Sequence, residues 1–199
     1  DKGLKECPNS LNIVGTIRLL EDRVAQKSVG FYSSSEYFLE KLLDNNKKSL
    51  EIGRACVDKN YRGSTAIHFL WIGLAEYILA RNIQLMFGVA SFHGNNVSNF
   101  SSALTLLKEK FSAPKKFGFK AKKIGFIEMN IIPLNKLKFT IAMNEMPSLL
   151  KAYLRMGALV SDGAFADKQF NTIDVGLMMI TDRINRKYRE LYGQSKKKK

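Results

Sequence analysis

The chain has 199 residues, 45% of them hydrophobic and 11% aromatic, with a formal net charge of +14. This length and composition suit one globular domain with a sizeable core. The longest apolar run, from Ile67 to Ala80, contains Glu76 and is shorter than the roughly 20 residues of a membrane-spanning helix, so no span is expected. Two cysteines, Cys7 and Cys56, are too few for a disulfide framework, and we expect a cytoplasmic protein with a reduced structural thiol at Cys56.

The positive charge is concentrated in two segments. Residues 108–123 contain seven lysines and one glutamate, and residues 183–199 contain eight basic residues and one glutamate. The rest of the chain is nearly neutral, which predicts two local basic surfaces. Neither segment carries a nucleic-acid-binding signature, and the first has only Phe111, Phe117 and Phe119 as aromatic residues. A basic nucleic-acid-binding module is therefore the weaker alternative, and no nucleic acid is expected as a partner.

Hydrophobic periodicity predicts strands and helices that alternate along one domain without internal repeats. The predicted strands cover residues 13–20, 50–57, 84–92 and 175–180. The predicted helices cover residues 64–81 and 97–111, a segment that begins at Pro147, and a polar segment after residue 180. The polar stretch between the first two strands holds at most a loop and a short helix, which Ser34 or Ser35 would cap. This alternation predicts an α/β fold with a mixed sheet covered by helices.

The stretch EIGRACVDKNYRGS, residues 51–64, ends a predicted strand in a turn that leads into a helix. Such a turn presents free backbone N–H groups and the positive end of a helix dipole, which suits a phosphate or pyrophosphate. Arg62 adds a cation, and Gly63 lets a ligand approach the backbone. An ordinary turn with Ser64 as the helix cap fits the same pattern. The absence of a Walker motif and of G-x-G-x-x-G disfavours nucleotide hydrolysis and dinucleotide binding.

Several blocks of sequence occur in the order found in a known family: LEIGRACV-DKNYRGS, HFLWIGL, LMFGVASFHG, MPSLLKAYLRMGA and FNTIDVGLMMITDRI. Together they resemble the acyl-carrier-protein-dependent N-acyltransferases that make lyso-ornithine lipid, a branch of the GNAT acyltransferase superfamily. The resemblance extends from about residue 13 to residue 184. It implies a GNAT-like α/β fold, with a central mixed sheet flanked by helices. It also implies that residues 57–66, with Val57 and Ser64 among them, grip the phosphopantetheine arm of an acyl donor, and that the fourth strand of the family fold splays from the fifth to admit the thioester.

The function implied by this resemblance is transfer of an acyl or 3-hydroxyacyl chain from acyl carrier protein to the α-amine of ornithine or a similar amino acid. The acyl-phosphopantetheine of the carrier is then the donor, and no permanently bound cofactor is expected. Homoserine-lactone synthases are similar around Glu51 and Arg54, so a signal synthase with the same donor is the neighbouring alternative. The family has further N-terminal sequence that helps to close the amino-acid pocket. Residues 1–199 are therefore expected to form one domain without that part.

Acyl transfer from a thioester to an amine requires a deprotonated amine, donors for the oxyanion and a proton for the leaving thiol. Glu51, on a buried strand, is the candidate general base, and Arg54 is its candidate partner. Because alternate residues of a strand face opposite sides, their pairing requires a β-bulge near Gly53. The alternative is that Glu51 is a structural acid satisfied by a neighbouring arginine. Backbone N–H groups near Cys56 and Val57 are the candidate oxyanion donors.

Three further residues are candidates for the site. His93, at the end of GVASFHG, suits a general base or a ligand for the substrate carboxylate; the alternative is a surface residue that forms hydrogen bonds. Asp162 and Asp174 are expected near strand ends and are candidates for substrate binding. Asp174 would contact the amine or stabilise a turn. Two histidines and two cysteines at wide spacing make a zinc site improbable, so no metal is expected.

The two basic segments have different expected roles. Lys115 and Lys116, in the segment expected beside the donor tunnel, are candidates for docking the acidic acyl carrier protein, with a solvated loop as the alternative. Residues 181–199 are expected to form a helix with one apolar edge and one cationic face, followed by a basic tail. This segment would give peripheral contact with the anionic inner face of the membrane. The alternative is that its apolar edge packs on the sheet.

Overall fold

The computed structural model describes residues 12–44 and 46–184. Its strands form one mixed sheet in the order β1-β3-β4-β8-β7-β5-β2, and β6 pairs with β7. The pairs β3–β4 and β5–β7 are parallel, and the other pairs are antiparallel. The strands are β1 (Gly15–Glu21), β2 (Tyr37–Phe38), β3 (Ser49–Val57), β4 (Leu85–His93), β5 (Lys120–Ala121), β6 (Phe126–Ile127), β7 (Leu159–Asp167) and β8 (Thr172–Ile180). The α-helices are α1 (Asp22–Ala25), α2 (Glu40–Leu43), α3 (Ala66–Arg81), α4 (Ser101–Phe111), α5 (Phe139–Glu145) and α6 (Ser148–Met156).

Apolar side chains of β4 and β8 pack on both faces of the sheet. On one face, Met86 of β4 and Val175 of β8 belong to the clusters built with α3, α4 and α6. On the other face, Phe87 and Met178 pack with residues of α1 and α2 and with Phe31, which directly precedes the 3-10 helix η1 (Tyr32–Ser35). Because side chains alternate along a strand, Asp174 of β8 lies on the same face as Met178. We call the face that carries η1 the acceptor face.

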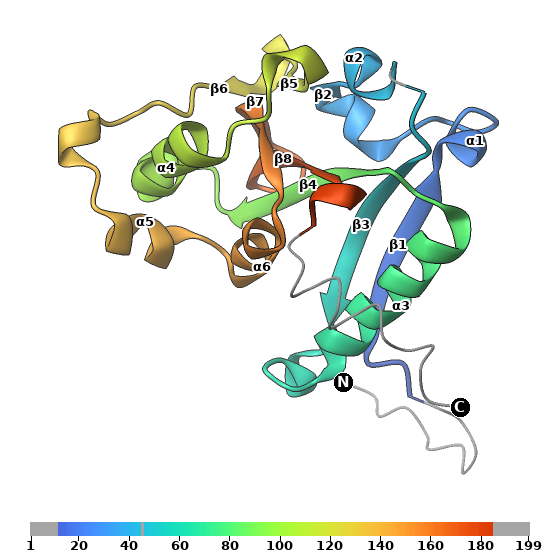
Figure 1. Cartoon of the computed structure of the whole chain (residues 1–199). Coiled ribbons are helices and arrows are strands. Elements are labelled where there is room, and N and C mark those ends of the chain that lie inside the picture. The colour runs from blue at the N-terminus through green and yellow to red at the C-terminus, as the bar shows by residue number, and fades with distance from the viewer. Residues whose placement is uncertain (1–11, 45, 185–199) are drawn as a thin grey trace.

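Strands β3 and β4 separate after a short parallel stretch. Their register extends from Ser49↔Leu85 to Glu51↔Phe87, although β3 continues to Val57 and β4 to His93. In Figure 1, β3 runs toward the loop before α3, whereas β4 turns toward α4. Gly88 lies where the strands begin to separate, and a Cβ there would lie 2.2 Å from the Ile52 carbonyl oxygen. The splayed strand pair implied by the family resemblance is therefore confirmed.

A β-bulge interrupts β3 just beyond this point. Gly53 pairs with Arg18 and Cys56 with Thr16, so the two residues 54 and 55 of β3 lie opposite a single residue of β1. Arg54 adopts φ +52°, a left-handed conformation that is uncommon for a residue with a side chain. The bulge expected near Gly53 is confirmed. Its consequence is that Arg54 contacts Tyr32 of η1 and therefore lies on the acceptor face.

Most of the long predicted elements agree with the structure, and two local predictions are wrong. The Ser34 and Ser35 hydroxyls donate to the carbonyls of Phe31 and Tyr32 within η1, so neither caps a helix. Cys56 is free, as expected, but it is exposed and not part of the core. Of the segment 181–199, a 3-10 turn at Thr181–Arg183 is described. The predicted helix and tail otherwise lie outside the described residues.

Candidate active site

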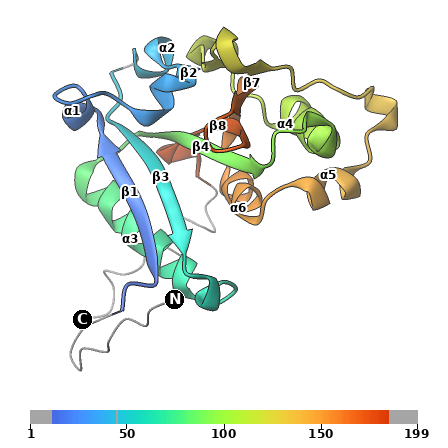
Figure 2. The same ribbon diagram turned by 180° about the vertical axis from the view of Figure 1, so that it is seen from behind.

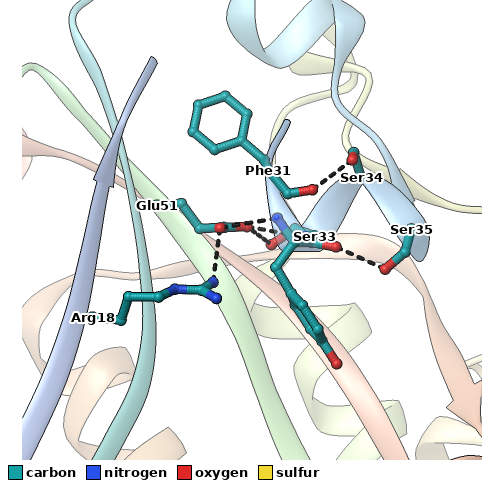
Figure 3. A network of polar contacts seen from close by, with 7 residues as sticks. Arg18, Phe31, Ser33, Ser34, Ser35 and Glu51 are labelled. Carbon is teal, nitrogen blue, oxygen red and sulfur yellow. Dashed lines mark hydrogen bonds and ion pairs between the residues drawn. The ribbon is translucent and has the colours of Figure 1, made fainter. Parts of the chain in front are cut away.

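The Glu51 carboxylate lies at the junction of β1, β3 and η1, with 1% of the residue exposed (Figure 3). Oε1 accepts hydrogen bonds from the Ser33 N–H and hydroxyl, both at 2.7 Å. Oε2 accepts from the Tyr32 N–H at 3.1 Å and from Arg18 Nη2 at 3.0 Å. A carboxylate has about four lone-pair sites, so its acceptor capacity is filled.

Arg18, and not Arg54, is therefore the partner of Glu51, which corrects the expected pairing. The arrangement agrees with the alternative of an acid satisfied by a neighbouring arginine. A direct proton transfer to Glu51 would require one of its four donors to leave. Its hydrogen bonds to Tyr32 and Ser33 hold η1 against the sheet, and a catalytic role for Glu51 stays a prediction.

Arg54 presents its guanidinium between two aromatic rings on the acceptor face. Its Cζ lies 5.5 Å from the centroid of Tyr32 and 5.7 Å from that of Phe170. Within residues 12–44 and 46–184 it forms no ion pair with a carboxylate. Stacking of this kind fixes a guanidinium while leaving its N–H groups free for an anion. Arg54 can therefore bind a carboxylate from a ligand.

Three carboxylates from distant parts of the chain meet on the acceptor face, and we call them the acidic cluster. Glu36 directly follows η1, Asp167 ends β7 and Asp174 lies on β8. One oxygen from each lies within 4.8 Å of the other two, and no other such group of potential metal ligands was found among the described residues. Glu36 and Asp174 are each 3% exposed. Glu36 Oε2 and Asp174 Oδ1 have no hydrogen-bond partner in the described part of the chain.

Tyr37 explains why Glu36 lies beside β8. The Tyr37 hydroxyl donates to the Asp174 carbonyl at 2.8 Å and accepts from the Gly176 N–H at 2.9 Å. The pairing of β7 with β8 is irregular between Val160 and Ala164. The Tyr37 hydroxyl therefore replaces backbone hydrogen bonds that a regular β7–β8 pairing would supply here. Because these hydrogen bonds fix Tyr37, the preceding residue Glu36 is held beside Asp174.

The strand register brings His93 to the same region. Asp174 lies opposite Ser91 of β4, and Thr172 lies opposite both His93 of β4 and Asp167 of β7. Directly opposite residues of antiparallel strands project to the same face. His93 is exposed at the end of β4 and so lies at the rim of the acidic cluster, on the edge of β4 that faces the splay.

Two members of the acidic cluster, Glu36 and Asp174, have raised pKa values. Burial raises the pKa of Glu36 to about 8, and the charges of Asp174 and Asp167 act in the same direction. Burial also raises the pKa of Asp174 and outweighs hydrogen bonds from Ser91 and Thr172, which act in the opposite direction. At neutral pH Glu36 therefore carries a proton in the unliganded protein. A bound cation would favour its release.

An apolar cavity of about 220 Å³ lies on the opposite face of the sheet. It is partly open to solvent and is bordered by α3, β4, α6 and β8, and Ile52, Trp71, Met86 and Tyr153 are among its lining residues. Ile52 and Gly88 mark the beginning of the strand splay and also line the cavity. The gap between β3 and β4 therefore begins at this cavity and borders the acceptor face with Arg54 on the other side of the sheet.

The loop before α3 borders the wide end of the same gap. The Asp58 N–H donates to the Val14 carbonyl at 2.8 Å and so faces β1. Because neighbouring N–H groups of a strand point to opposite sides, the Val57 N–H faces the gap, whereas the Cys56 N–H faces β1. Val57 is therefore a possible oxyanion donor or donor-arm ligand, and the role expected for the Cys56 N–H is wrong.

The side chains of this loop are exposed around the end of β3. Arg62 Nε donates to the Val57 carbonyl at 3.3 Å, which places its guanidinium at the end of the gap. Gly63 has φ +81°, and no atom lies within 4 Å of a Cβ built on it. The Ser64 hydroxyl accepts from the Ala66 N–H at 3.2 Å, but the N-cap of α3 is Thr65, which forms no side-chain capping hydrogen bond, so the expected cap by Ser64 is wrong. The open space at Gly63 and the cation at Arg62 suit an anionic group.

Two predicted sites lie elsewhere. Asp162 forms ion pairs with Lys108 and with Lys120, the second at 3.3 Å, and is not part of the acidic cluster. It lies inside β7 at the irregular stretch and not at a strand end. Lys115 and Lys116 are exposed on the 3-10 helix η4 (Lys115–Phe117), which contacts α2 and precedes β5. α2 and β5 lie at the opposite end of the molecule from the loop before α3 (Figures 1 and 2). The two lysines are therefore not beside that loop, and their role in carrier docking stays a prediction.

The sequence interpretation missed Glu36 and Asp167. Glu36 occupies the polar segment SSSEYF, in which no residue was singled out for chemistry. Asp167 and Asp174 flank the tight connection between β7 and β8, with Asp167 accepting from the N–H groups of Gln169 and Phe170. Two acids that flank a predicted hairpin are a local sequence signal from which Asp167 could have been selected together with Asp174. Their convergence with Glu36 depends on the anchoring of Tyr37, which the sequence pattern does not reveal.

The splayed strands, the β-bulge, the exposed loop before α3 and the cavity beside the gap define a GNAT-type acyltransferase. In agreement, residues 5–72 match the family model described as "Acetyltransferase (GNAT) domain". The chain is also 40% identical over 180 residues to an L-ornithine N(alpha)-acyltransferase of Rhodobacter capsulatus, an alignment that covers 90% of this chain and 69% of the relative. It belongs to the L-ornithine N(alpha)-acyltransferase family and is an acyltransferase.

Other relatives carry the same name. The enzyme of Brucella abortus is 36% identical over 188 residues, which cover 94% of this chain and 67% of the relative. That of Rhizobium meliloti is 35% identical over 183 residues, which cover 91% of this chain and 62% of the relative. No solved structure gives a significant match. None of the helices among the described residues has the length and apolar character needed to cross a membrane.

Proposed function

We propose that this protein transfers an acyl or 3-hydroxyacyl chain from acyl carrier protein to the α-amine of L-ornithine. The observation that carries the proposal is the gap between β3 and β4, with an apolar cavity on one side of the sheet and a charged acceptor face on the other. An acyl thioester combines an apolar chain with a polar reacting carbonyl, which suits such a passage. The names of the relatives support ornithine as the acceptor.

The donor is proposed to enter beside the loop before α3. Arg62 and the backbone at Gly63 and Ser64 bind the phosphate of the phosphopantetheine arm, since free N–H groups and a cation at a helix start attract anions. The arm extends along the free edge of β3, and the acyl chain enters the cavity lined by Trp71. The acyl-phosphopantetheine is a substrate, and no other cofactor is proposed.

The acceptor is proposed to bind on the face that carries η1. Arg54 binds the α-carboxylate, which directs the α-amine toward the gap. The amine nitrogen attacks the thioester carbonyl, the carbon–sulfur bond breaks, and the sulfur leaves as a thiol after taking up the proton that the amine loses. The Val57 N–H stabilises the developing oxyanion. His93, at the rim of the same face, accepts the proton of the amine, because imidazole is the commonest general base in enzymes.

Two partners are proposed from the charge of the chain. Acyl carrier protein is acidic, so exposed cations on this chain would increase its association rate. Peripheral contact with an anionic membrane rests on the basic composition of residues 181–199, of which the structure describes residues 181–184. Sedimentation with anionic vesicles at low salt, release at high salt and loss on deletion of residues 183–199 would support that contact. An intact protein that never sediments would contradict it.

One assay tests the proposed function. Purified protein is incubated with acyl carrier proteins carrying different chains and with a panel of free amino acids, and the products are identified by mass spectrometry. N-acylornithine is the expected product. Transfer to S-adenosylmethionine followed by lactone formation would instead assign a signal synthase. No transfer from any thioester would contradict the proposal.

A further inference from the structure

None of the three acids of the acidic cluster forms an ion pair within the described residues. Glu36 and Asp174 are buried to 97%, since each is 3% exposed, and each keeps one oxygen without a hydrogen-bond partner in the described chain. Buried polar groups are normally satisfied, and like charges in proximity destabilise a fold. Such an arrangement is kept at a site where a ligand supplies the missing donors and the missing positive charge.

The position of the cluster indicates which ligand this is. It lies on the same face as Arg54, and Tyr32 lies near both. Arg54 Cζ is 5.5 Å from the centroid of the Tyr32 ring. Burial raises the pKa of Tyr32, and the charges of Glu36, Asp167 and Asp174 raise it further, whereas Arg54 lowers it. A free amino acid whose carboxylate binds Arg54 would therefore extend its side chain across this face. Ser91 of β4 lies opposite Asp174, and β4 borders the gap in which the thioester is proposed to react. Asp174 of the acidic cluster is therefore on the strand next to the one that borders the gap.

We infer that the acidic cluster binds the side-chain ammonium of a diamino acid and selects it over amino acids with neutral side chains. This inference rests on the proposed function, because it places the α-amine of the same substrate at the gap. An ammonium has three N–H donors, and the unpartnered oxygens of Glu36 and Asp174, together with Asp167, supply matching acceptors. Because the cluster is buried, the cost of leaving it unfilled discriminates strongly between substrates.

The strongest competing interpretation is that the cluster deprotonates the α-amine. The two roles are separated by norvaline, which has the α-amine, carboxylate and carbon chain of ornithine but lacks the side-chain ammonium. An ammonium-binding residue affects ornithine alone, whereas a base for the α-amine affects both amino acids. A divalent metal is the other ligand that three carboxylates suit, and it is tested directly.

The experiment measures binding of ornithine and norvaline by calorimetry in the absence of an acyl donor, with the wild-type chain, Asp174→Asn, Asp167→Asn and Glu36→Gln. Glu40→Gln, an exposed acid on α2, is the matched control. The wild type should bind ornithine about tenfold or more tightly than norvaline, and Asp174→Asn should remove most of this difference while norvaline binding is unchanged. Thermal unfolding without ligand checks the fold, and the variants should be at least as stable as wild type because they remove buried like charges.

Three outcomes would overturn the inference: equal wild-type affinity for the two amino acids, equal losses for both in Asp174→Asn, or stabilisation by Mg²⁺, Mn²⁺ or Ca²⁺ that depends on Asp174 and competes with ornithine. The same set is then assayed for acyl transfer as the ratio of kcat/KM for ornithine and norvaline. Binding that depends on Asp174 without any transfer would retain the inference and contradict the proposed function. Transfer with an unchanged ratio in the variants would do the reverse.

Discussion

Arg18 and Glu51 form an ion pair of 3.0 Å between β1 and β3, with the arginine side chain 39% exposed and the carboxylate 1% exposed. The carboxylate also accepts three hydrogen bonds from η1, so the pair fastens the segment that carries Tyr32 and Glu36 to the sheet. Glu51→Gln replaces one acceptor oxygen by a donor and leaves buried N–H groups without partners, each at a cost of about 1–3 kcal/mol. We expect a lower Tm and a higher KM for the amino acid.

The pH profile of kcat separates this positioning role from catalysis. If Glu51 is the general base, turnover of Glu51→Gln should fall at every pH with little change in Tm. If it holds η1 in place, the shape of the profile should stay that of wild type while KM rises. Arg18→Ala provides the matched test, because it removes the same pair without touching the carboxylate. Wild-type Tm, KM and turnover in both variants would contradict both roles.

The donor loop gives a second prediction. Arg62→Ala should raise KM for the acyl donor severalfold with an unchanged Tm. The Arg62 side chain is exposed, and among the described residues its hydrogen bond is to the Val57 carbonyl at the end of β3. Gly63→Val should act in the same direction by filling the open space above the backbone, with some loss of stability because Gly63 has φ +81°. Lys27→Ala, an exposed cation after α1, is the control. Unchanged donor kinetics in both loop variants would remove the loop from the donor site.

The positions of the cations lead to a third prediction, for carrier docking. Lys115 and Lys116 lie far from the loop before α3, whereas Lys59 and Arg62 lie within it (Figure 1). Reversing Lys59 to Glu should therefore raise KM for acyl carrier protein more than reversing both Lys115 and Lys116, and the effect should fade at high salt. A short pantetheine thioester serves as the control donor, since it lacks the carrier. A larger effect at Lys115 and Lys116 would restore the docking surface first expected from charge alone.

The order of the long elements was predictable because each has its own hydrophobic period. α3 and β4 lie close to the predicted bounds, since a long apolar segment beginning after a Ser-Thr pair and a short apolar run between turns are local signals. The short strands β2 and β5 were not predictable, because each has two residues and forms only through pairing with distant segments.

The same distinction applies to the candidate site. The family blocks located the donor loop, Arg54 and Asp174, because these residues lie within contiguous motifs. The partner of Glu51 was missed, since Arg18 meets it across two strands that are distant in sequence. The bulge at Arg54 was required by the proposed pairing and is present, yet it serves to stack Arg54 on Tyr32 and Phe170.

A fourth prediction follows from the raised pKa of Glu36. Between its ordinary pKa of 4.5 and about 8, the folded chain holds a proton that the unfolded chain has lost, so the free energy of unfolding falls as pH rises through this window. Asp174, Asp167 and Glu51 all act in the direction that raises the pKa. Glu36→Gln should therefore have a Tm close to wild type at pH 5 and a higher Tm at pH 8. A wild-type Tm that rises relative to the variant over this range would contradict the assignment.

The cavity gives the last prediction, which concerns the acyl chain. Ala75 of α3 and Ala158 before β7 line the cavity, so enlarging either side chain to Leu fills space that the distal part of the chain would occupy. We expect Ala75→Leu to lower kcat/KM about tenfold for long-chain donors and to leave short-chain donors unchanged, with a stability change of about 1–3 kcal/mol or less. Ala80→Leu, on the same helix but exposed and outside the lining residues, is the matched control. A uniform loss across all chain lengths would indicate that the substitution disturbs α3 as a whole, and an unchanged preference would place the acyl chain outside this cavity.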